Sequence, residues 1–418
     1  MLQNVTFTQQ MIDCLASCCP RCAEAMGWLC QLPFQMYWFI SVRKWARAVL
    51  LLVLLLLYCE FLHYFVVLLQ CSWPQLANSG VSQQLGLGKE HKPLKVMVIA
   101  DLHLLGWREG HWFDKVRREW QMERSFKTSV LLYNPDVVFV LGDLLDEGQW
   151  CSDFEFKYHE ERFKSMFSVS SKTDMHVVVG NHDIGFHYVM NRHKHHRFES
   201  AFNSPSVRML RIRDNIFVLV NSMTLEGDGC SLCSEAVGKL RGISQHLECI
   251  ENPLKSQSHY NKCHHYEQFK YTKPILLQHF PMYRPSDADC DTPDAAPPGV
   301  KNIPFKLKVD CLSKEASRQL LDWISPRFII SAHTHHGCYR VHDNNIPEWT
   351  VASYSWRNKN NPTFLLMTVG NEDYAVKRCF LPSEFTVIMM YIIGVFTVLL
   401  LLIFPRRVVK FSSGDKAH

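Results

Sequence analysis

The fold is decided by the segment 95–103, which reads KVMVIADLH. The largely apolar run 95–100 has the length and composition of a strand that is buried on both faces of a sheet. An aspartate and a histidine, Asp101 and His103, follow this run at once. The segment therefore predicts a buried strand whose carboxyl end carries groups that can bind a metal ion.

Strand-like and helix-like segments alternate after this point. Residues 112–133 have helical character, and 136–141 (DVVFVL) predict a second strand. A helix at about 153–168 and a strand at 176–179 follow. This alternation predicts an α/β domain with a largely parallel sheet. We expect a second sheet to be completed by later apolar runs, at 216–220, 275–279, 328–332, 349–352 and 363–369.

Polar side chains that can bind metals follow five of these runs. In α/β folds, the carboxyl ends of the strands are where ligands gather. Seven such side chains can hold two divalent ions, three on each ion and one shared between them. The first ion takes Asp101, His103 and His335, the second takes Asn181, His279 and His333, and Asp143 bridges the two.

The chemistry of this ligand set favours phosphate as the substrate group. The set contains only two carboxylates, so two divalent cations remain electrophilic. In two-metal sites, ions about 3.5–4 Å apart clamp phosphate oxygens and promote in-line attack. Every ligand is nitrogen or oxygen, which favours manganese, iron or zinc over a soft metal.

One further histidine is expected to meet the substrate. His182 follows Asn181 directly, within the run Gly180-Asn181-His182-Asp183. It could stabilise the transition state or protonate the leaving oxygen, and Asp183 is available to orient it. We therefore predict His182 as the catalytic residue.

These motifs, in this order, resemble those of the calcineurin-like metallophosphoesterases. The family pattern is Asp-x-His, Gly-Asp-x-x-Asp, Gly-Asn-His-Asp/Glu, His and Gly-His-x-His, and the resemblance spans about residues 95–340. It implies two mixed β-sheets packed face to face and flanked by helices, the same seven metal ligands, and His182 as the catalytic histidine. Ala332 replaces the usual glycine before His333. We expect that change to be tolerated unless the position needs a positive φ.

Two apolar stretches near the ends of the chain are long enough to cross a bilayer. Residues 385–404 contain no charged residue. Residues 46–69 contain Glu60 and His63, which are costly to bury in hydrocarbon. Basic residues precede the first stretch and follow the second, which predicts a signal anchor and a second span with both termini in the cytosol. The alternatives are a cleaved signal peptide for the first stretch and burial in a soluble fold for the second.

This topology divides the chain into five parts. We expect a cytosolic tail at 1–45, a transmembrane helix at 46–69, a lumenal domain at 70–384 with insertions in 226–312, a transmembrane helix at 385–404 and a cytosolic tail at 405–418. Ten of the 16 cysteines fall in the lumenal part, where disulfides persist, although their pairing cannot be deduced from sequence. Palmitoylation, zinc binding and plain thiols all remain open for the N-terminal cysteines, Cys14, Cys18, Cys19, Cys22 and Cys30.

Composition agrees with a folded domain that does not bind nucleic acid. The chain has 418 residues, of which 47% are hydrophobic and 20% charged, so it can bury a substantial core. Its formal net charge of +5 is too small to indicate nucleic-acid binding.

The layout with two spans resembles a membrane-bound branch of the family, which removes a side-branch ethanolamine phosphate from a mannose of the GPI-anchor glycan. That resemblance implies a phosphodiesterase that uses manganese, with zinc or iron as alternatives. It also implies GPI-anchored proteins as substrates, contact with cargo-transport machinery, and action in the endoplasmic reticulum, its exit sites and the Golgi. Two other readings stay open: a phosphomonoesterase acting on phosphoproteins or lipid phosphates, and a cargo receptor without enzymatic activity.

Three further motifs have both a functional and a structural interpretation. Residues that could line the mouth of the site, or pack in the core, are Trp107, Arg108, His111 and Trp112. Residues 187–197 could attract an anionic glycan, but we expect a solvated loop. Cys230-x-x-Cys233, with Cys263-His264-His265, has the composition of a zinc site, but disulfides are the stronger expectation in the lumen.

Overall fold

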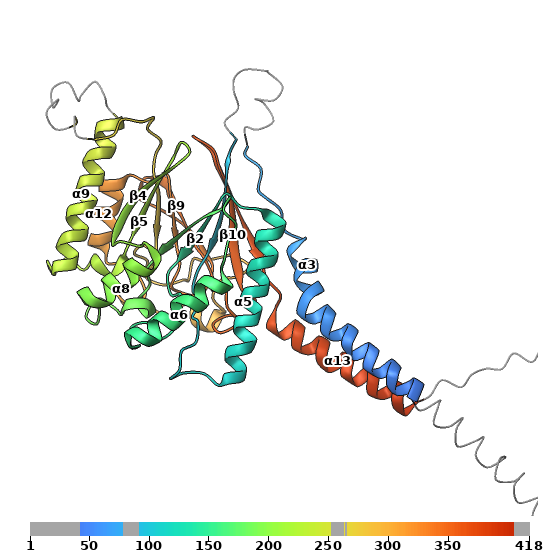
Figure 1. Cartoon of the computed structure of the whole chain (residues 1–418). Coiled ribbons are helices and arrows are strands. Elements are labelled where there is room, and N and C mark those ends of the chain that lie inside the picture. Colours follow the sequence, from blue (N-terminus) through green and yellow to red (C-terminus); the bar gives the residue numbers. More distant parts are fainter. Residues whose placement is uncertain (1–41, 78–91, 252–262, 264–265, 405–418) are drawn as a thin grey trace, which may run out of the picture. The chain divides into compact units, whose positions relative to one another are not determined.

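The computed structural model describes residues 42–77, 92–251, 263 and 266–404 (Figure 1). The chain divides into two compact units. One unit is His63–Thr386, which contains both sheets. The other consists of the described helical segments that precede and follow it in the sequence. The N-terminal cysteines of the sequence analysis, together with His264 and His265, lie outside the described residues.

The first sheet has five strands. In spatial order they are β11 (Tyr374–Phe380), β10 (Thr363–Val369), β1 (Leu94–Ile99), β2 (Val137–Leu141) and β3 (Asp174–Val178). Strands β1, β2 and β3 run parallel, β10 runs antiparallel to β1, and β11 runs antiparallel to β10. The sheet is therefore mixed, with its parallel part at one side.

The second sheet has six strands and is also mixed. In spatial order they are β4 (Val207–Ile212), β5 (Asn215–Val220), β6 (Ile275–Gln278), β7 (Phe328–Ser331), β9 (Ile346–Thr350) and β8 (Cys338–His342). Strands β5, β6, β7 and β9 are parallel, and an antiparallel strand closes each edge.

The two sheets pack face to face through apolar side chains. Val96 and Val98 of β1 belong to one buried cluster with residues of the second sheet, and the rings of Phe139 and Phe217 lie 5.0 Å apart in it. Alternate side chains of β1, such as Met97, point to the opposite face and join the core beneath the helices. Burial on both faces explains why β1 has an almost continuous apolar sequence.

Helices cover the outer face of each sheet (Figure 1). Helices α5 (Trp112–Tyr133) and α6 (Asp153–Met166) lie on the first sheet, and α9 (Ser231–Glu251) and α12 (Lys314–Ile324) lie on the second. Helix α6 begins where Ser152 and Glu155 form a capping box. The predicted fold, two mixed sheets packed face to face and flanked by helices, is confirmed. The remaining short elements are α7 (Asn181–Ile184), η2 (Ser222–Thr224), α11 (Pro298–Lys301) and η4 (Asp343–Asn345).

Two expectations about the elements are wrong. The run 363–369 belongs to the first sheet, because β10 pairs antiparallel with β1, as in Val98 opposite Leu365. The expected loop at 187–197 contains the start of a helix, α8 (Arg192–Phe202), which Asn191 caps. The segment 226–312, expected to hold insertions, contains the 21-residue helix α9, and its status as an insertion stays a prediction.

Two helices are long and apolar enough to cross a membrane, Val42–Leu68 and Glu384–Ile403. The first includes a π-helical turn, η1 (Tyr58–Leu62), and continues into α3 (His63–Leu68); the second is α13. Glu60 within η1 accepts a hydrogen bond from the Tyr391 hydroxyl, so its carboxyl group has a polar partner among the apolar side chains. The predicted domain boundaries and orientation stay predictions.

Eight of the ten cysteines within residues 70–384 are joined in four disulfides. The pairs are Cys71–Cys379, Cys230–Cys233, Cys249–Cys263 and Cys290–Cys338. Among the described residues, Cys151 and Cys311 of this domain are buried free thiols.

Candidate metal centre

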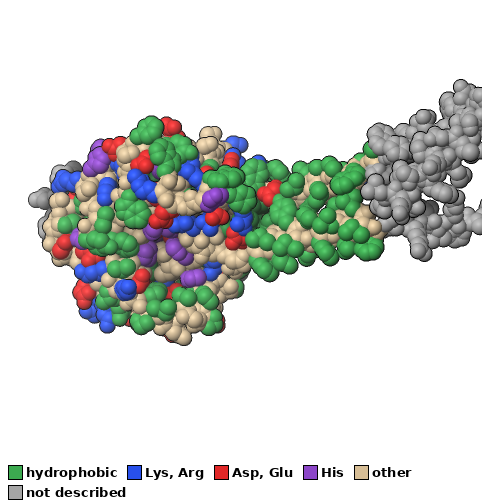
Figure 2. Space-filling model, turned by 90° about the horizontal axis from the view of Figure 1, so that it is seen from below, with side chains coloured by type: hydrophobic (Ala, Val, Ile, Leu, Met, Phe, Trp, Pro, Cys, Tyr) green, Lys and Arg blue, Asp and Glu red, His purple; other side chains and the backbone are tan. Residues whose placement is uncertain are grey.

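The seven predicted ligands follow the carboxyl ends of β1, β2, β3, β6 and β7. Backbone hydrogen bonds join the loops beyond these strands. The His103 amide donates to Asp143 O at 2.9 Å, and the Ala332 amide donates to His279 O at 2.8 Å. The structure therefore brings all seven residues to one region of the domain. Figure 2 shows histidine side chains gathered on this face.

The backbone is strained where it presents these ligands. Positive φ values are uncommon for residues other than glycine and cluster at functional sites. Five of the seven predicted ligands have them: Asp101 (52°), His103 (47°), Asp143 (50°), His333 (74°) and His335 (60°). Ala332 is not among the positive-φ residues, so the condition under which alanine would be harmful there is not met.

Four donors form a first cluster. Asp101, His103, Asp143 and His335 each offer one atom, and these atoms lie within 4.8 Å of one another. Nε2 of His103 is 3.1 Å from Nε2 of His335 and 3.5 Å from Oδ2 of Asp143. Nε2 of His335 is 4.0 Å from Oδ1 of Asp101. These four residues can hold one ion.

A second cluster lies beside the first and shares Asp143 with it. Asp143, His279 and His333 have donor atoms within 4.8 Å of one another. Nε2 of His279 is 3.3 Å from Asp143 Oδ2, 3.3 Å from His333 Nδ1 and 3.2 Å from Asn181 Oδ1. Asp143 is therefore placed where a bridging carboxylate must lie.

The donor set fits two divalent ions. Oδ1 of Asp101 and Oδ2 of Asp143 are buried and accept no hydrogen bond from the described part of the chain. Burying a carboxylate oxygen without a partner is costly, and a cation would remove that cost. Two donors that each lie about 2.0–2.2 Å from one ion can be at most about 4.4 Å apart. The individual donor–donor distances given above, from 3.1 to 4.0 Å, meet that limit.

Groups behind the imidazoles fix which nitrogen faces the centre. Nδ1 of His103 donates to Asp146 Oδ1 at 2.9 Å, and Nδ1 of His279 donates to Leu141 O at 2.7 Å. Nε2 of His333 donates to Val309 O at 2.7 Å. Such outer hydrogen bonds hold the tautomer and orientation of ligand histidines. They leave the opposite nitrogen of each ring directed at the cluster.

His182 lies at the edge of the centre with its side chain 30% exposed. Its ring is 4.6 Å from the ring of His103, and its amide donates to Asp143 Oδ1 at 2.8 Å. Its Nδ1 donates to the main-chain oxygen of Asp146 at 2.9 Å. The suggestion that Asp183 orients this ring is wrong, because Asp183 instead accepts from the amides of Leu145 and Gly180.

Residues 94–337, more than half of the chain, match the family described as calcineurin-like phosphoesterase. The chain belongs to this family.

Curated relatives support the same assignment. The chain is 48% identical to Metallophosphoesterase 1 of Gallus gallus over 340 residues, which are 80% of this chain and 83% of that one. It is 41% identical to Metallophosphoesterase 1 of Danio rerio over 379 residues, 90% of this chain and 96% of that one. A solved dimetal phosphatase from Danio rerio has 14% identity and a TM-score of 0.41 over 69% of this chain and 96% of that one, a likeness too weak to support a function.

As a calcineurin-like phosphoesterase, the chain is a metal-dependent phosphoester hydrolase whose fold implies two divalent ions. In the metal-free form, burial alone would raise the pKa of Asp143, but the His279 and His182 imidazoles hold it well below its usual range. Burial opposes a charge on His279, yet Asp143 raises its pKa to about 9. Burial and His279 lower the pKa of His333 to about 3. In the metal-free centre, the Asp143 carboxylate is therefore ionised and the His333 imidazole is neutral.

Three residues without a predicted role hold the proposed ligands or their partners in place. Asp146 is the second aspartate of Gly-Asp-x-x-Asp, so the motif contained a signal for it. Arg357 approaches Asp146, with Nη2 2.6 Å from Oδ2, but it is 211 residues later in the chain. Val309 contributes only its carbonyl. Neither Arg357 nor Val309 stands in a motif that could have indicated it.

The aromatic residues expected at the mouth are at the surface. Trp107 is 53% exposed, and its ring lies 6.2 Å from Phe154 and 5.7 Å from Tyr158. Trp112 is also exposed. The alternative, that these tryptophans pack in the core, is therefore wrong.

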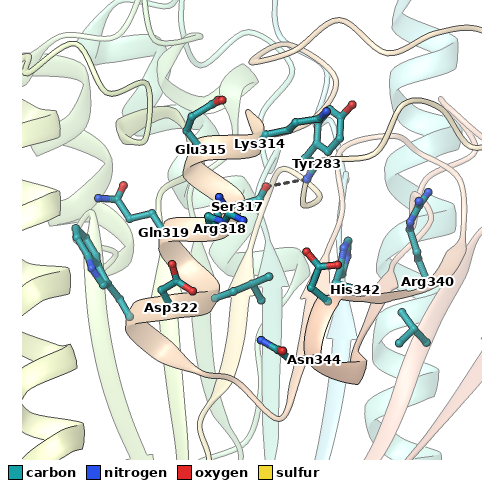
Figure 3. Close-up of a pocket in the computed structure, with 14 residues that line it drawn as sticks. Tyr283, Lys314, Glu315, Ser317, Arg318, Gln319, Asp322, Arg340, His342 and Asn344 are labelled. Carbon is teal, nitrogen blue, oxygen red and sulfur yellow. Dashed lines mark hydrogen bonds between the residues drawn. The ribbon is translucent and has the colours of Figure 1, made fainter.

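A large cleft lies beside α12 (Figure 3). Its volume is about 1120 Å³, and residues of α12 and of the end of β8, such as Arg318 and His342, line it. None of the seven predicted ligands is among its lining residues. The volume of a cleft therefore does not by itself indicate where the substrate binds.

Proposed function

We propose that this calcineurin-like phosphoesterase cleaves a phosphodiester that joins ethanolamine phosphate to a mannose of the GPI-anchor glycan. The observation that carries the catalytic part is that Asp143 belongs to both donor clusters, beside a partly exposed His182. The substrate is proposed on a different ground. Two helices could span a membrane, and this layout resembles the branch of the family that acts on the GPI glycan. Asp101, His103, Asp143 and His335 would hold one ion; Asp143, Asn181, His279 and His333 would hold the other.

The chemistry divides between the ions and the chain. When bound, two such ions clamp phosphate oxygens and activate a nucleophile. Burial opposes protonation of His182, but Asp143 and Asp146 outweigh it and raise the pKa of the imidazole. Nδ1 of His182 is held by Asp146, so Nε2 is the nitrogen that can donate a proton to the leaving oxygen.

Two features support action on the lumenal side of a membrane. The domain contains four disulfides, and disulfides persist in the secretory pathway rather than in the cytosol. Two helices of the chain are apolar and long enough to span a bilayer. A tethered domain would meet substrates that are themselves anchored in lipid. We place it in the endoplasmic reticulum, its exit sites and the Golgi, with both termini cytosolic.

Manganese is the proposed metal, and zinc or iron would suit the same donors. All seven donors are nitrogen or oxygen, with no thiolate among them. The proposed partners are GPI-anchored proteins as substrates and, through their export, the machinery of transport from the endoplasmic reticulum to the Golgi.

The test is hydrolysis by the full chain in detergent micelles loaded with manganese. The substrate is a GPI glycan that carries ethanolamine phosphate on mannose, and mass spectrometry follows the loss of that group. Asp143→Asn should abolish turnover and lower the bound manganese, while circular dichroism stays unchanged. Asp289→Asn is the matched control, because Asp289 is 76% exposed and lies away from both clusters.

Other outcomes point to the alternatives. Faster cleavage of a monoester than of a diester would favour a phosphomonoesterase. If His182→Ala removes hydrolysis but leaves transport of GPI-anchored proteins in cells intact, the result would favour a receptor role. Unchanged GPI side branches in cells that lack the chain would contradict the substrate while leaving the metal chemistry standing.

A further inference from the structure

A second set of metal-binding side chains lies outside the dinuclear centre. His187, Asp228, Cys230 and Cys233 each offer one donor atom, and these atoms lie within 4.8 Å of one another. None of the four belongs to the clusters around Asp143. From the sequence alone, zinc binding at Cys230 and Cys233 would involve different histidines, His264 and His265.

Hydrogen bonds already organise these four residues. Nε2 of His187 lies 2.8 Å from Asp228 Oδ2, and Nδ1 lies 3.1 Å from Met223 O and 3.7 Å from Cys233 Sγ. The Cys230 amide donates to Asp228 Oδ1 at 3.1 Å. Gly227 and Gly229 have φ values of 80° and 72°, so the chain turns sharply on both sides of Asp228. The hydrogen bonds with His187 and the Cys230 amide hold the carboxylate beside the cysteine pair.

The two sulfurs are placed at the start of a long helix. Cys230 directly precedes α9, and Cys233 is in its first turn. The Cys233 amide donates to Cys230 Sγ at 3.0 Å. A helix N-terminus and a direct amide donor both stabilise thiolates, and a thiolate is the form that binds metal.

Cys230 and Cys233 are joined as a disulfide, so the pair must be reduced before it can bind an ion. Cys230 is partly exposed and Cys233 is buried, so Cys230 is the sulfur that a reductant reaches. A dithiol would supply two electrons and two protons, break the S–S bond and become a disulfide itself. Binding of a divalent cation to the two resulting thiols would then release two protons to solvent.

We propose that the reduced chain binds one zinc-type ion through Cys230, Cys233, His187 and Asp228, at a site separate from the dinuclear centre. Two thiolates, an imidazole and a carboxylate are a donor set that suits tetrahedral zinc. Donors at about 2.0–2.3 Å from one ion are at most about 4.6 Å apart. The four donor atoms therefore need only small shifts, apart from the sulfurs, which must separate once their bond is broken.

The test uses cobalt(II) as a coloured substitute for zinc. The full chain in micelles is treated with a water-soluble phosphine, which is oxidised to its oxide as it reduces disulfides. We expect one further cobalt ion per chain and a near-ultraviolet thiolate-to-cobalt charge-transfer band. Asp143→Asn should keep this band, because the dinuclear donors are only nitrogen and oxygen. Absence of the band from the reduced wild-type chain would overturn the proposal.

Matched variants identify the thiols responsible. Cys230→Ser with Cys233→Ser should lose the band, whereas Cys249→Ser with Cys263→Ser, which removes a different disulfide, should keep it. The reverse result would overturn the proposal. If the first double variant does not fold, His187→Gln keeps both thiols and should weaken cobalt binding by about tenfold or more. An unchanged affinity in His187→Gln would contradict the site.

Discussion

Nδ1 of His103 donates a hydrogen bond to Oδ1 of Asp146 at 2.9 Å. The main-chain oxygen of Asp146 accepts from Nδ1 of His182 at 2.9 Å, so one residue orients both a proposed ligand and the proposed proton donor. Arg357 holds the other carboxylate oxygen at 2.6 Å. Asp146 is thus a positioning residue for the centre.

Asp146→Asn should weaken the ion that His103 holds. The amide keeps the shape of the carboxylate but loses its charge and its ion pair with Arg357. Loss of such an outer carboxylate lowers metal affinity by about 10–100-fold. Hydrolysis measured across a manganese titration should therefore need more metal to saturate. Asp289→Asn is the control, and an identical titration for Asp146→Asn and the control would rule out this role.

Gly180→Ala should disrupt the bridging position. A Cβ at residue 180 would lie 2.2 Å from Asp143 Oδ1 and 2.3 Å from the Asp143 main-chain nitrogen. The nitrogen belongs to the backbone, so the clash can be relieved only by moving Asp143 or the backbone of residue 180, which precedes Asn181. A displacement of about 1 Å in a catalytic group can cost about 100-fold in rate.

Gly238→Ala is the control for this loss of activity. Gly238 lies in α9, and a Cβ there meets nothing within 4 Å. Alanine in a helix interior is favoured over glycine by about 0.5–1 kcal/mol, so this variant should be fully active and slightly more stable. Normal turnover by Gly180→Ala would show that the Asp143 position tolerates displacement.

The site was predictable because its signals are local. Asp101 follows the apolar run of β1 directly, and Asn181 lies three residues beyond β3, so short stretches of sequence contained both the strand and the proposed ligand. Arg357 carries no such signal, since it lies in an irregular segment between β9 and β10 and reaches Asp146 only in the folded chain.

The arrangement of the strands was less predictable. The composition of 363–369 indicated a strand, but the choice of sheet depends on its pairing with β1 across more than 260 residues. Helix α8 was missed because His195 and Phe198 are its only buried residues, which gives no clear apolar periodicity. Disulfide pairing likewise depends on the folded geometry.

Metal affinity should rise with pH, because the metal-free His279 carries a proton that must leave. Burial disfavours its charge, but Asp143 raises its pKa to about 9. Coordination requires the neutral imidazole. Below that pKa, loss of this one proton should make the metal affinity rise about tenfold per pH unit. The rise should level off above about pH 9.

Calorimetry can measure the released proton. Manganese is titrated into the full metal-free chain at pH 7 in two buffers with different ionisation enthalpies. The difference in observed heat should correspond to release of at least one proton, since burial and Asp143 also raise the pKa of Asp101. Equal heats in both buffers would contradict a protonated His279.

The Cys71–Cys379 disulfide joins two positions 308 residues apart, near the two ends of the domain. A longer closed loop restricts the unfolded chain more, so losing this disulfide should cost more stability than losing Cys249–Cys263, which spans 14 residues. Chain-entropy estimates give about 3 kcal/mol for a 15-residue loop and about 4.7 kcal/mol for 100 residues. The full chains with each pair changed to serine can be compared by protease resistance on heating. Equal losses, or a larger loss for the shorter loop, would show that strain or local packing outweighs loop entropy here.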